Sequence, residues 1–250
     1  MSSVAIACVV FAFVFGGALL GLLVRALLPE HHLSAETKDT VKLGMGLIGS
    51  MAALVLGLLV ASAKSSFDTR TSEITQMAAN IILLDRGLAH YGPETKEARE
   101  LLRRSVAQLI EQLWSDGRSR PAQASQTDGR ESLYDRIQAL SPQNDAQRST
   151  LAQVLTITVN IGQTRWLLVA QSGSSISVPF LMVLVFWLAV IFVSWGLFAP
   201  RNAMVIATLL LCALSFSCAV YLILELDRPF RGLIQISSAP LREALAALGR

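Results

Sequence analysis

Four long runs of apolar residues without a charged side chain dominate the chain. They cover Val4–Val24, Leu43–Ala63, Ser177–Phe198 and Asn202–Leu224. An apolar helix of about 20 residues crosses a hydrocarbon core about 30 Å thick. Each run reaches that length, and one charged residue at its centre would cost about 3 kcal/mol on insertion. The pattern therefore predicts an all-α integral membrane protein with four transmembrane helices.

Between the second and third runs, apolar residues recur at helical spacing in a polar background. From Lys64 to Arg86 the sequence contains neither Gly nor Pro. We therefore expect the second span to continue as one helix of roughly 50 residues, from Ser34 to the region of His90. Its polar half has an apolar face, which predicts a partner helix. That face consists of Ile74, Met77, Ile81, Leu84 and Leu88.

Local signals predict further helices in the central segment and at the C-terminus. One begins at Pro93, a short one covers Glu131–Leu140, and one follows Ser141-Pro142, which has the form of an N-cap with proline at the first helical position. Another begins near Ser238. The low-complexity stretch at about 115–130 has almost no apolar content and predicts a flexible loop.

These elements divide the chain into four segments. Residues 1–63 hold the first two transmembrane helices with a short loop, and 64–176 form a helical cytoplasmic region. Residues 177–225 form a transmembrane hairpin, and 226–250 form an amphipathic tail. Near the predicted membrane boundaries, five Lys and Arg residues lie on the side of the termini and four lie on the opposite side. This count places both termini and the central region in the cytoplasm.

The composition agrees with a protein made of a membrane part and a water-facing part. Charged residues make up 16% of the chain, compared with about 25% in soluble domains. Since every charge lies outside the four apolar runs, a soluble globular protein is excluded. The net charge of +3 is explained by basic residues near membrane ends, so the expected partner is the lipid bilayer and not nucleic acid.

The sequence shows no motif of a nucleotide-binding loop, an activated nucleophile or a zinc site. Its three cysteines lie inside the apolar runs and have no metal-ligand spacing. We therefore expect no enzyme activity, no metal and no cofactor. A charged group at the end of the fourth span marks a membrane boundary, where ionisable residues either pair locally or carry function. It consists of Glu225, Asp227 and Arg228.

One face of the second span is built from small residues, and we call it the small-residue face. Its members recur every three or four positions: Gly46, Ser50, Ala53, Gly57, Ala61 and Lys64. Small residues let helix backbones approach closely, which is the interpretation that the sequence alone favours. The alternative is a water-facing stripe that lines a pore, with Lys64 attracting anions near its mouth.

Several segments resemble the bacterial bestrophin-like family of uncharacterised membrane proteins. The resemblance covers nearly the whole chain apart from the loop at about 115–130. The matching segments are Glu36–Ile48, Ala52–Ser65, Ala79–Arg86, Ala89–Pro93, Leu140–Gln147, Gln171–Ile176, Glu225–Phe230 and Leu233–Leu241.

The resemblance implies a distant relation to bestrophins, which are pentameric anion channels with four transmembrane helices, cytoplasmic termini and a pore lined by the second span. It therefore suggests a homo-oligomeric channel for small ions such as chloride in the bacterial inner membrane. The small-residue face departs from the bulky pore lining of bestrophins, and the acidic cluster of their calcium clasp is missing. The alternative is a non-conducting scaffold or sensor that recruits a partner through its cytoplasmic helices.

Overall fold

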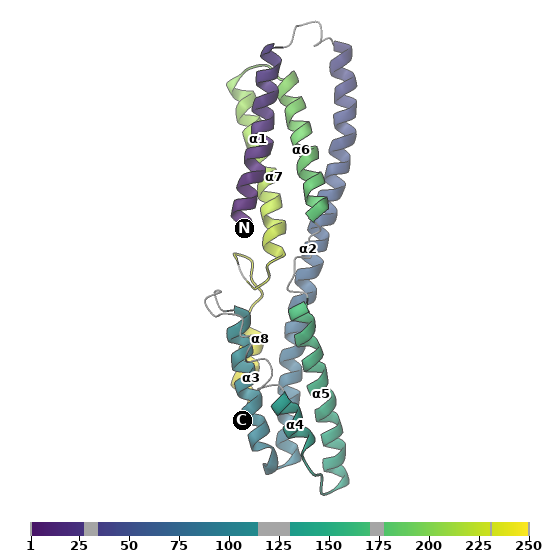
Figure 1. Cartoon of the computed structure of the whole chain (residues 1–250), viewed down its shortest axis with the longest axis vertical. Helices are drawn as coiled ribbons and strands as arrows, with labels where there is room; N and C mark the ends of the chain where they lie inside the picture. The colour runs from purple at the N-terminus through teal and green to yellow at the C-terminus, as the bar shows by residue number, and fades with distance from the viewer. Residues whose placement is uncertain (1, 28–34, 115–130, 171–177, 231, 250) are drawn as a thin grey trace. The chain divides into compact units, whose positions relative to one another are not determined.

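A computed structural model describes residues 2–27, 35–114, 131–170, 178–230 and 232–249. Within these ranges the chain is helical and contains no strand, which confirms the all-α prediction (Figure 1). The loop predicted at about 115–130 lies outside them. The helices are α1 (Ser3–Leu27), α2 (Ala35–Tyr91), η2 (Pro93–Thr95), α3 (Lys96–Trp114), α4 (Glu131–Gln138), α5 (Asp145–Ala170), α6 (Val178–Phe198), α7 (Ala203–Leu226) and α8 (Ala239–Ala247).

Four of these helices are long and apolar enough to cross a membrane, as the apolar runs predict. They are α1, α2, α6 and α7. The chain forms two compact units, each described here by itself. The membrane unit comprises Met1–Ser66 and Ser174–Arg228, and the helical unit comprises Phe67–Gly173 and Pro229–Arg250.

Helix α2 contributes to both units, since it continues through 57 residues without a break. At about 1.5 Å per residue it is about 85 Å long. This confirms the prediction that the second apolar run continues into the polar segment after it as one helix. The glycines of its apolar run are tolerated because a helix satisfies its own backbone hydrogen bonds in lipid.

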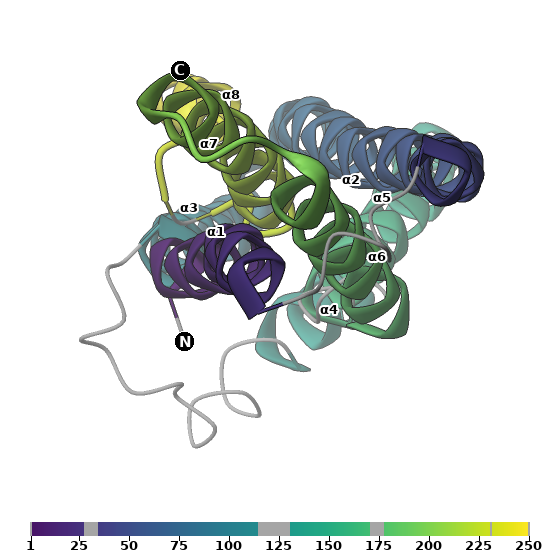
Figure 2. The same cartoon turned by 90° about the horizontal axis from the view of Figure 1, so that it is seen from above.

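In the membrane unit, α1 packs against α6 and α7 (Figures 1 and 2). Glycines on both sides allow α1 and α6 to approach backbone to backbone. A Cβ atom on Gly21 would overlap the carbonyl oxygen of Val193, and one on Gly196 would overlap that of Ala18. Such close approach is a common way for helices to associate in lipid, where van der Waals packing replaces the hydrophobic effect.

Two hydrogen bonds join α1 to α7 and to the turn between α6 and α7. The buried hydroxyl of Ser217 donates to the carbonyl oxygen of Ala7 at 2.7 Å, which joins α7 to α1. At the other end of α1, Arg201 donates to the carbonyl oxygen of Leu22 at 2.9 Å. Arg201 lies in the short turn between α6 and α7.

The helical unit has its own apolar core. The apolar face predicted on the polar half of α2 is fully buried there, with all five of its residues 0% exposed. This confirms that the face packs against partner helices. The core also contains residues of α3, α4, α5 and α8, namely Ala98, Leu102, Val106, Leu109, Ile110, Ile137, Val154, Leu168, Leu241 and Ala244.

The predicted start of the helix after Ser141-Pro142 is wrong. Helix α5 begins at Asp145, and the side-chain oxygen of Asn144 accepts the backbone N–H of Gln147 at 2.8 Å. The side-chain oxygen of Gln147 in turn accepts the backbone N–H of Gln143 at 2.7 Å. This reciprocal arrangement resembles a capping box and satisfies amide groups that a helix start leaves unpaired.

Candidate functional site

The small-residue face of α2 is exposed along its whole length. All six of its predicted members are exposed in the protomer. A Cβ atom added to Gly46 or Gly57 would have no neighbouring atom within 4 Å. The helices that the structure describes therefore leave this face exposed at its glycines.

The second span as a whole is the least covered of the four. In its most apolar stretch 11% of the residues are buried, compared with 33%, 28% and 22% in α1, α6 and α7. Helix α2 contributes Ala52, Leu59 and Ala63 to the core of the membrane unit. At about 100° of rotation per residue, the centre of these three lies about 140° around α2 from the centre of the small-residue face.

Between α2 and α6 lies an apolar groove with a volume of about 1,100 Å³. Small and aliphatic residues of α2 form one wall, including Gly46, Gly49, Ala53 and Gly57. The other wall is aromatic and comes from α6, with Phe192, Trp195 and Phe198, and Phe216 of α7 adds to it.

Two lysines of α2 line the groove near its ends. Lys42 and Lys64 are separated by 22 residues, which corresponds to about 33 Å along a helix and matches the thickness of a hydrocarbon core. The ammonium group of Lys42 lies 3.2 Å from Asp39, and both side chains are 72% exposed. A surface pair of this kind contributes less than about 1 kcal/mol and exchanges partners easily.

Ser50 is the one member of the small-residue face that does not line the groove. Its hydroxyl donates to the carbonyl oxygen of Gly46 at 3.0 Å, one turn earlier in the same helix. This bond satisfies the hydroxyl proton inside an apolar run. Ser50 is an exposed residue, and its hydroxyl oxygen can still accept a hydrogen bond.

The charged group predicted at the end of the fourth span forms the last turn of α7 and the residues after it. Glu225 is 5% exposed and therefore does not extend into water. Asp227 is the C-cap residue of α7, and the backbone N–H of Arg228 donates to the carbonyl oxygen of Glu225 at 3.0 Å. Glu225, Asp227 and Arg228 thus lie at the C-terminal end of α7. They do not line the groove that the small-residue face lines.

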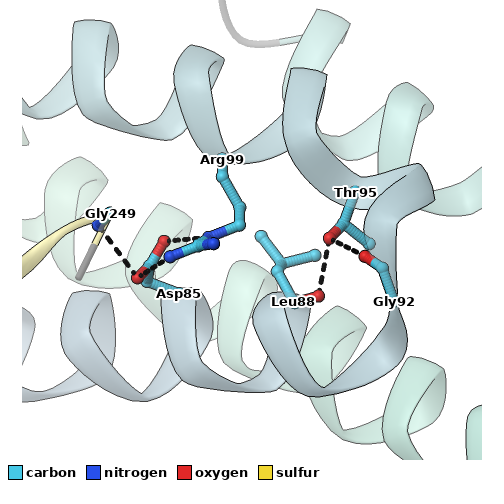
Figure 3. Close-up of polar contacts among 6 residues, drawn as sticks. All are labelled: Asp85, Leu88, Gly92, Thr95, Arg99 and Gly249. Carbon is cyan, nitrogen blue, oxygen red and sulfur yellow. Dashed lines mark hydrogen bonds and ion pairs between the residues drawn. The ribbon is translucent and has the colours of Figure 1, made fainter.

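A buried ion pair joins α2 to α3 in the helical unit (Figure 3). Two nitrogens of the Arg99 guanidinium donate to the two carboxylate oxygens of Asp85 at 2.7 and 2.8 Å. The side chain of Asp85 is 7% exposed and that of Arg99 is 24% exposed. The hydrogen bond to Asp85 raises the pKa of Arg99 above its ordinary value, so the arginine stays charged.

The same carboxylate lies near the end of the chain. The backbone N–H of Gly249 points to it at 3.4 Å, after α8 has packed against α3 (Figure 3). One turn further along α2, the hydroxyl of Thr95 lies 2.6 Å from the carbonyl oxygen of Leu88 and 2.8 Å from that of Gly92. These contacts close the α2–α3 connection, and their role is structural.

Within the described ranges, no group of three or more His, Cys, Asp or Glu side chains is placed to hold a metal ion. Asp85 and Arg99 are engaged with each other and do not line the groove between α2 and α6. The exposed α2 surface with its groove is therefore the candidate functional site.

Reasoning from the sequence missed two parts of this site. Gly49 also lines the groove, and its spacing from Gly46 and Ala53 was a usable signal. The aromatic wall of α6 had no such signal, because periodicity within one helix does not say which other helix faces it.

Comparison with known proteins gives one finding. A family model described as the bestrophin-like domain matches residues 11–241. Neither a curated protein nor a solved structure matches the chain.

Proposed function

Because the chain belongs to the family of proteins with a bestrophin-like domain, we propose that it forms a membrane channel for small ions, with a preference for anions such as chloride. The channel is a homo-oligomer in which the small-residue face of α2 lines the pore. By resemblance to bestrophins the subunit number is five. One protomer with four spans has too few helices to enclose an aqueous path, so several copies are required.

The observation that carries this proposal is the exposure of the small-residue face. Helix α1 packs against α6 and α7, whereas a Cβ atom added to Gly46 or Gly57 of the small-residue face would have no atom of the described chain within 4 Å. Glycine, serine and alanine leave room for water next to the helix. Lys64 at one end of this face provides a positive potential that favours anions.

The proposal places the protein in the inner membrane of a bacterium, with the termini and the helical unit in the cytoplasm. The count of basic residues near the membrane supports this orientation. A reporter fused to the C-terminus, which is active only in the cytoplasm, tests it directly.

The channel is tested with the purified protein in planar bilayers under asymmetric chloride. We expect a current that reverses toward the chloride equilibrium potential. Gly57→Trp places a large side chain on the small-residue face and should abolish the current.

Gly16→Trp is the matched control. Gly16 is also an exposed glycine of a spanning helix with no atom within 4 Å of an added Cβ atom, but it lies on α1. This variant should conduct like the wild type. An oligomer that carries no current over a wide range of voltage and pH would refute the channel and would favour the scaffold.

A further inference from the structure

The helical unit contains a cavity of its own, which we call the helical-unit cavity. It has a volume of about 260 Å³ and is lined by residues of α2, α3, α4 and α5. It shares no residue with the groove of the membrane unit, so the proposed channel makes no use of it. Pockets for drug-sized ligands have volumes of about 300–1,000 Å³, and a slightly smaller cavity suits a smaller molecule.

The walls of the helical-unit cavity are mostly apolar. Ile81 and Leu84 of α2, both 0% exposed, contribute to them. The other apolar lining residues come from α3, α4 and α5 and are Leu102, Val106, Leu109, Leu133, Val159 and Ile161. Water in a cavity needs two to four polar partners, and an empty apolar cavity forfeits van der Waals contacts. The walls therefore favour an occupant with an apolar body.

A glycine of α5 keeps the cavity open. Gly162 lines the cavity, and a Cβ atom added to it would have no neighbouring atom within 4 Å. Glycine weakens a helix relative to alanine, and it is useful where another group must come close to the backbone. At Gly21 that group is the backbone of α6, whereas at Gly162 it is not part of the described chain. Gly162 therefore leaves room for a bound molecule.

The charge of the cavity lining is positive. Arg165 of α5 is the only charged side chain among the described residues that line it. Its guanidinium donates to the side-chain oxygen of Gln112 at 3.2 Å, and a guanidinium with five N–H donors can serve several acceptors at once. Because no acidic residue is among the described lining residues, the cavity favours an anionic group over an ammonium group.

Three hydroxyl groups add to this polar set, from Ser105 of α3, Tyr134 of α4 and Thr158 of α5. Thr158 donates its proton to the carbonyl oxygen of Val154 at 2.8 Å. The hydroxyls of Ser105 and Tyr134 form no hydrogen bond with the described part of the chain, so both can donate to a ligand oxygen. Hydrogen bonds from a guanidinium to a carboxylate are charge-assisted and stronger than those between neutral groups.

We propose that the helical-unit cavity binds a small monocarboxylic acid with an apolar body. The carboxylate accepts hydrogen bonds from Arg165, and the body packs against the apolar walls and the open backbone at Gly162. Thr158 and Arg165 lie seven residues apart on one side of α5, which corresponds to about 10 Å. This length accommodates an aromatic ring with a short acid side chain.

Three probes with the same apolar body and different charge test the site: phenylpropionate, phenylpropanol and phenylpropylamine. Their binding to the full chain in lipid nanodiscs is measured by titration calorimetry, and titration of empty nanodiscs corrects for partition into lipid. We expect the acid to bind about tenfold more tightly than the alcohol, because its hydrogen bonds are charge-assisted. The amine should bind more weakly than the alcohol. Equal affinities for the acid and the alcohol would overturn the proposal.

Two variants locate the bound acid. Gly162→Leu fills the cavity without a clash at Cβ and should abolish binding at an unchanged melting temperature, whereas Ala152→Leu, at an exposed position of α5 outside the cavity, should bind like the wild type. Arg165→Gln removes the charge and should weaken binding of the acid about tenfold while leaving the alcohol unaffected. Arg148→Gln is its control, since Arg148 is an exposed arginine of α5 that does not line the cavity.

Undiminished binding of the acid by Gly162→Leu would place the bound molecule elsewhere and overturn the proposal. If Gly162→Leu does not fold, Arg165→Gln decides, and an unchanged ratio of acid to alcohol affinity would overturn the proposal as well. The site and the channel can fail separately. A current from a protein that does not bind the acid refutes the site alone, whereas binding of the acid by a protein without any current refutes the channel alone.

Discussion

The close approach of α1 and α6 predicts that one added methyl group at Gly21 destabilises the protein. Gly21→Ala adds a Cβ atom that would overlap the carbonyl oxygen of Val193 and lie 2.9 Å from the backbone nitrogen of Leu197. Both neighbours are backbone atoms of a helix, so no side chain can rotate away. Carbon atoms normally keep about 3.5–4.0 Å from nonbonded neighbours, and the two helices must therefore separate by about 1 Å.

The cost of this separation follows from packing. A gap of about 0.5–1 Å already removes a quarter to a half of each van der Waals contact, and overpacking of this kind costs about 1–3 kcal/mol. For a chain of this size, 1 kcal/mol lowers the melting temperature by about 2–4 °C. Gly21→Ala should therefore melt about 2–12 °C below the wild type.

Gly16→Ala is the matched control on the same helix. Its added methyl group has no neighbour within 4 Å, and alanine is the better helix former by about 1 kcal/mol. It should be as stable as the wild type or slightly more stable. Melting of both variants in the same detergent, followed by loss of the folded peak in size-exclusion chromatography, measures the difference. Equal stability of the two variants would show that α1 and α6 do not approach as described.

Three further predictions concern polar groups. Arg99→Leu leaves the buried carboxylate of Asp85 without its partner and should lower the free energy of unfolding by about 3 kcal/mol in a denaturation assay. Arg104→Leu, which removes an exposed ion pair, should lower it by less than about 1 kcal/mol in the same assay. Trp114→Phe removes the indole hydrogen bond to the carbonyl group before α8, so amide hydrogen exchange in α8 should become faster. Lys64→Glu reverses a charge near the proposed pore mouth, so the reversal potential should move away from that of chloride, and an unchanged value would contradict the anion preference.

Much of the fold follows from periodicity and length. The charge-free runs identify the four helices that can span a membrane, and the spacing from Ile74 to Leu88 identifies the buried side of α2. The start of α5 was predicted at Pro142 because the preceding serine has the form of a cap. The competing signal was Asn144 followed by Gln147 three residues later, which is the pattern of a capping box.

Partners distant in sequence were harder to predict. Asp85 has Arg86 next to it in sequence, but it pairs with Arg99, which lies 14 residues away on another helix. Gly17 and Gly21 have the spacing of a close helix contact, yet the pattern does not say which helix approaches them. Only the packing of α6 against α1 identifies Gly196 as the glycine of α6 that faces α1.

The sequence by itself determined that this protein has four membrane-length helices and that one of them has a small-residue face. Those properties depend on local spacing and on the cost of placing charge in lipid, so they can be read from a single chain. The tertiary structure decided which sides of that helix the protomer covers. Ala52 and Leu59 are buried, whereas Gly57 and Leu58 remain exposed, because α1 packs against α6 and α7 and most of the apolar run of α2 stays uncovered.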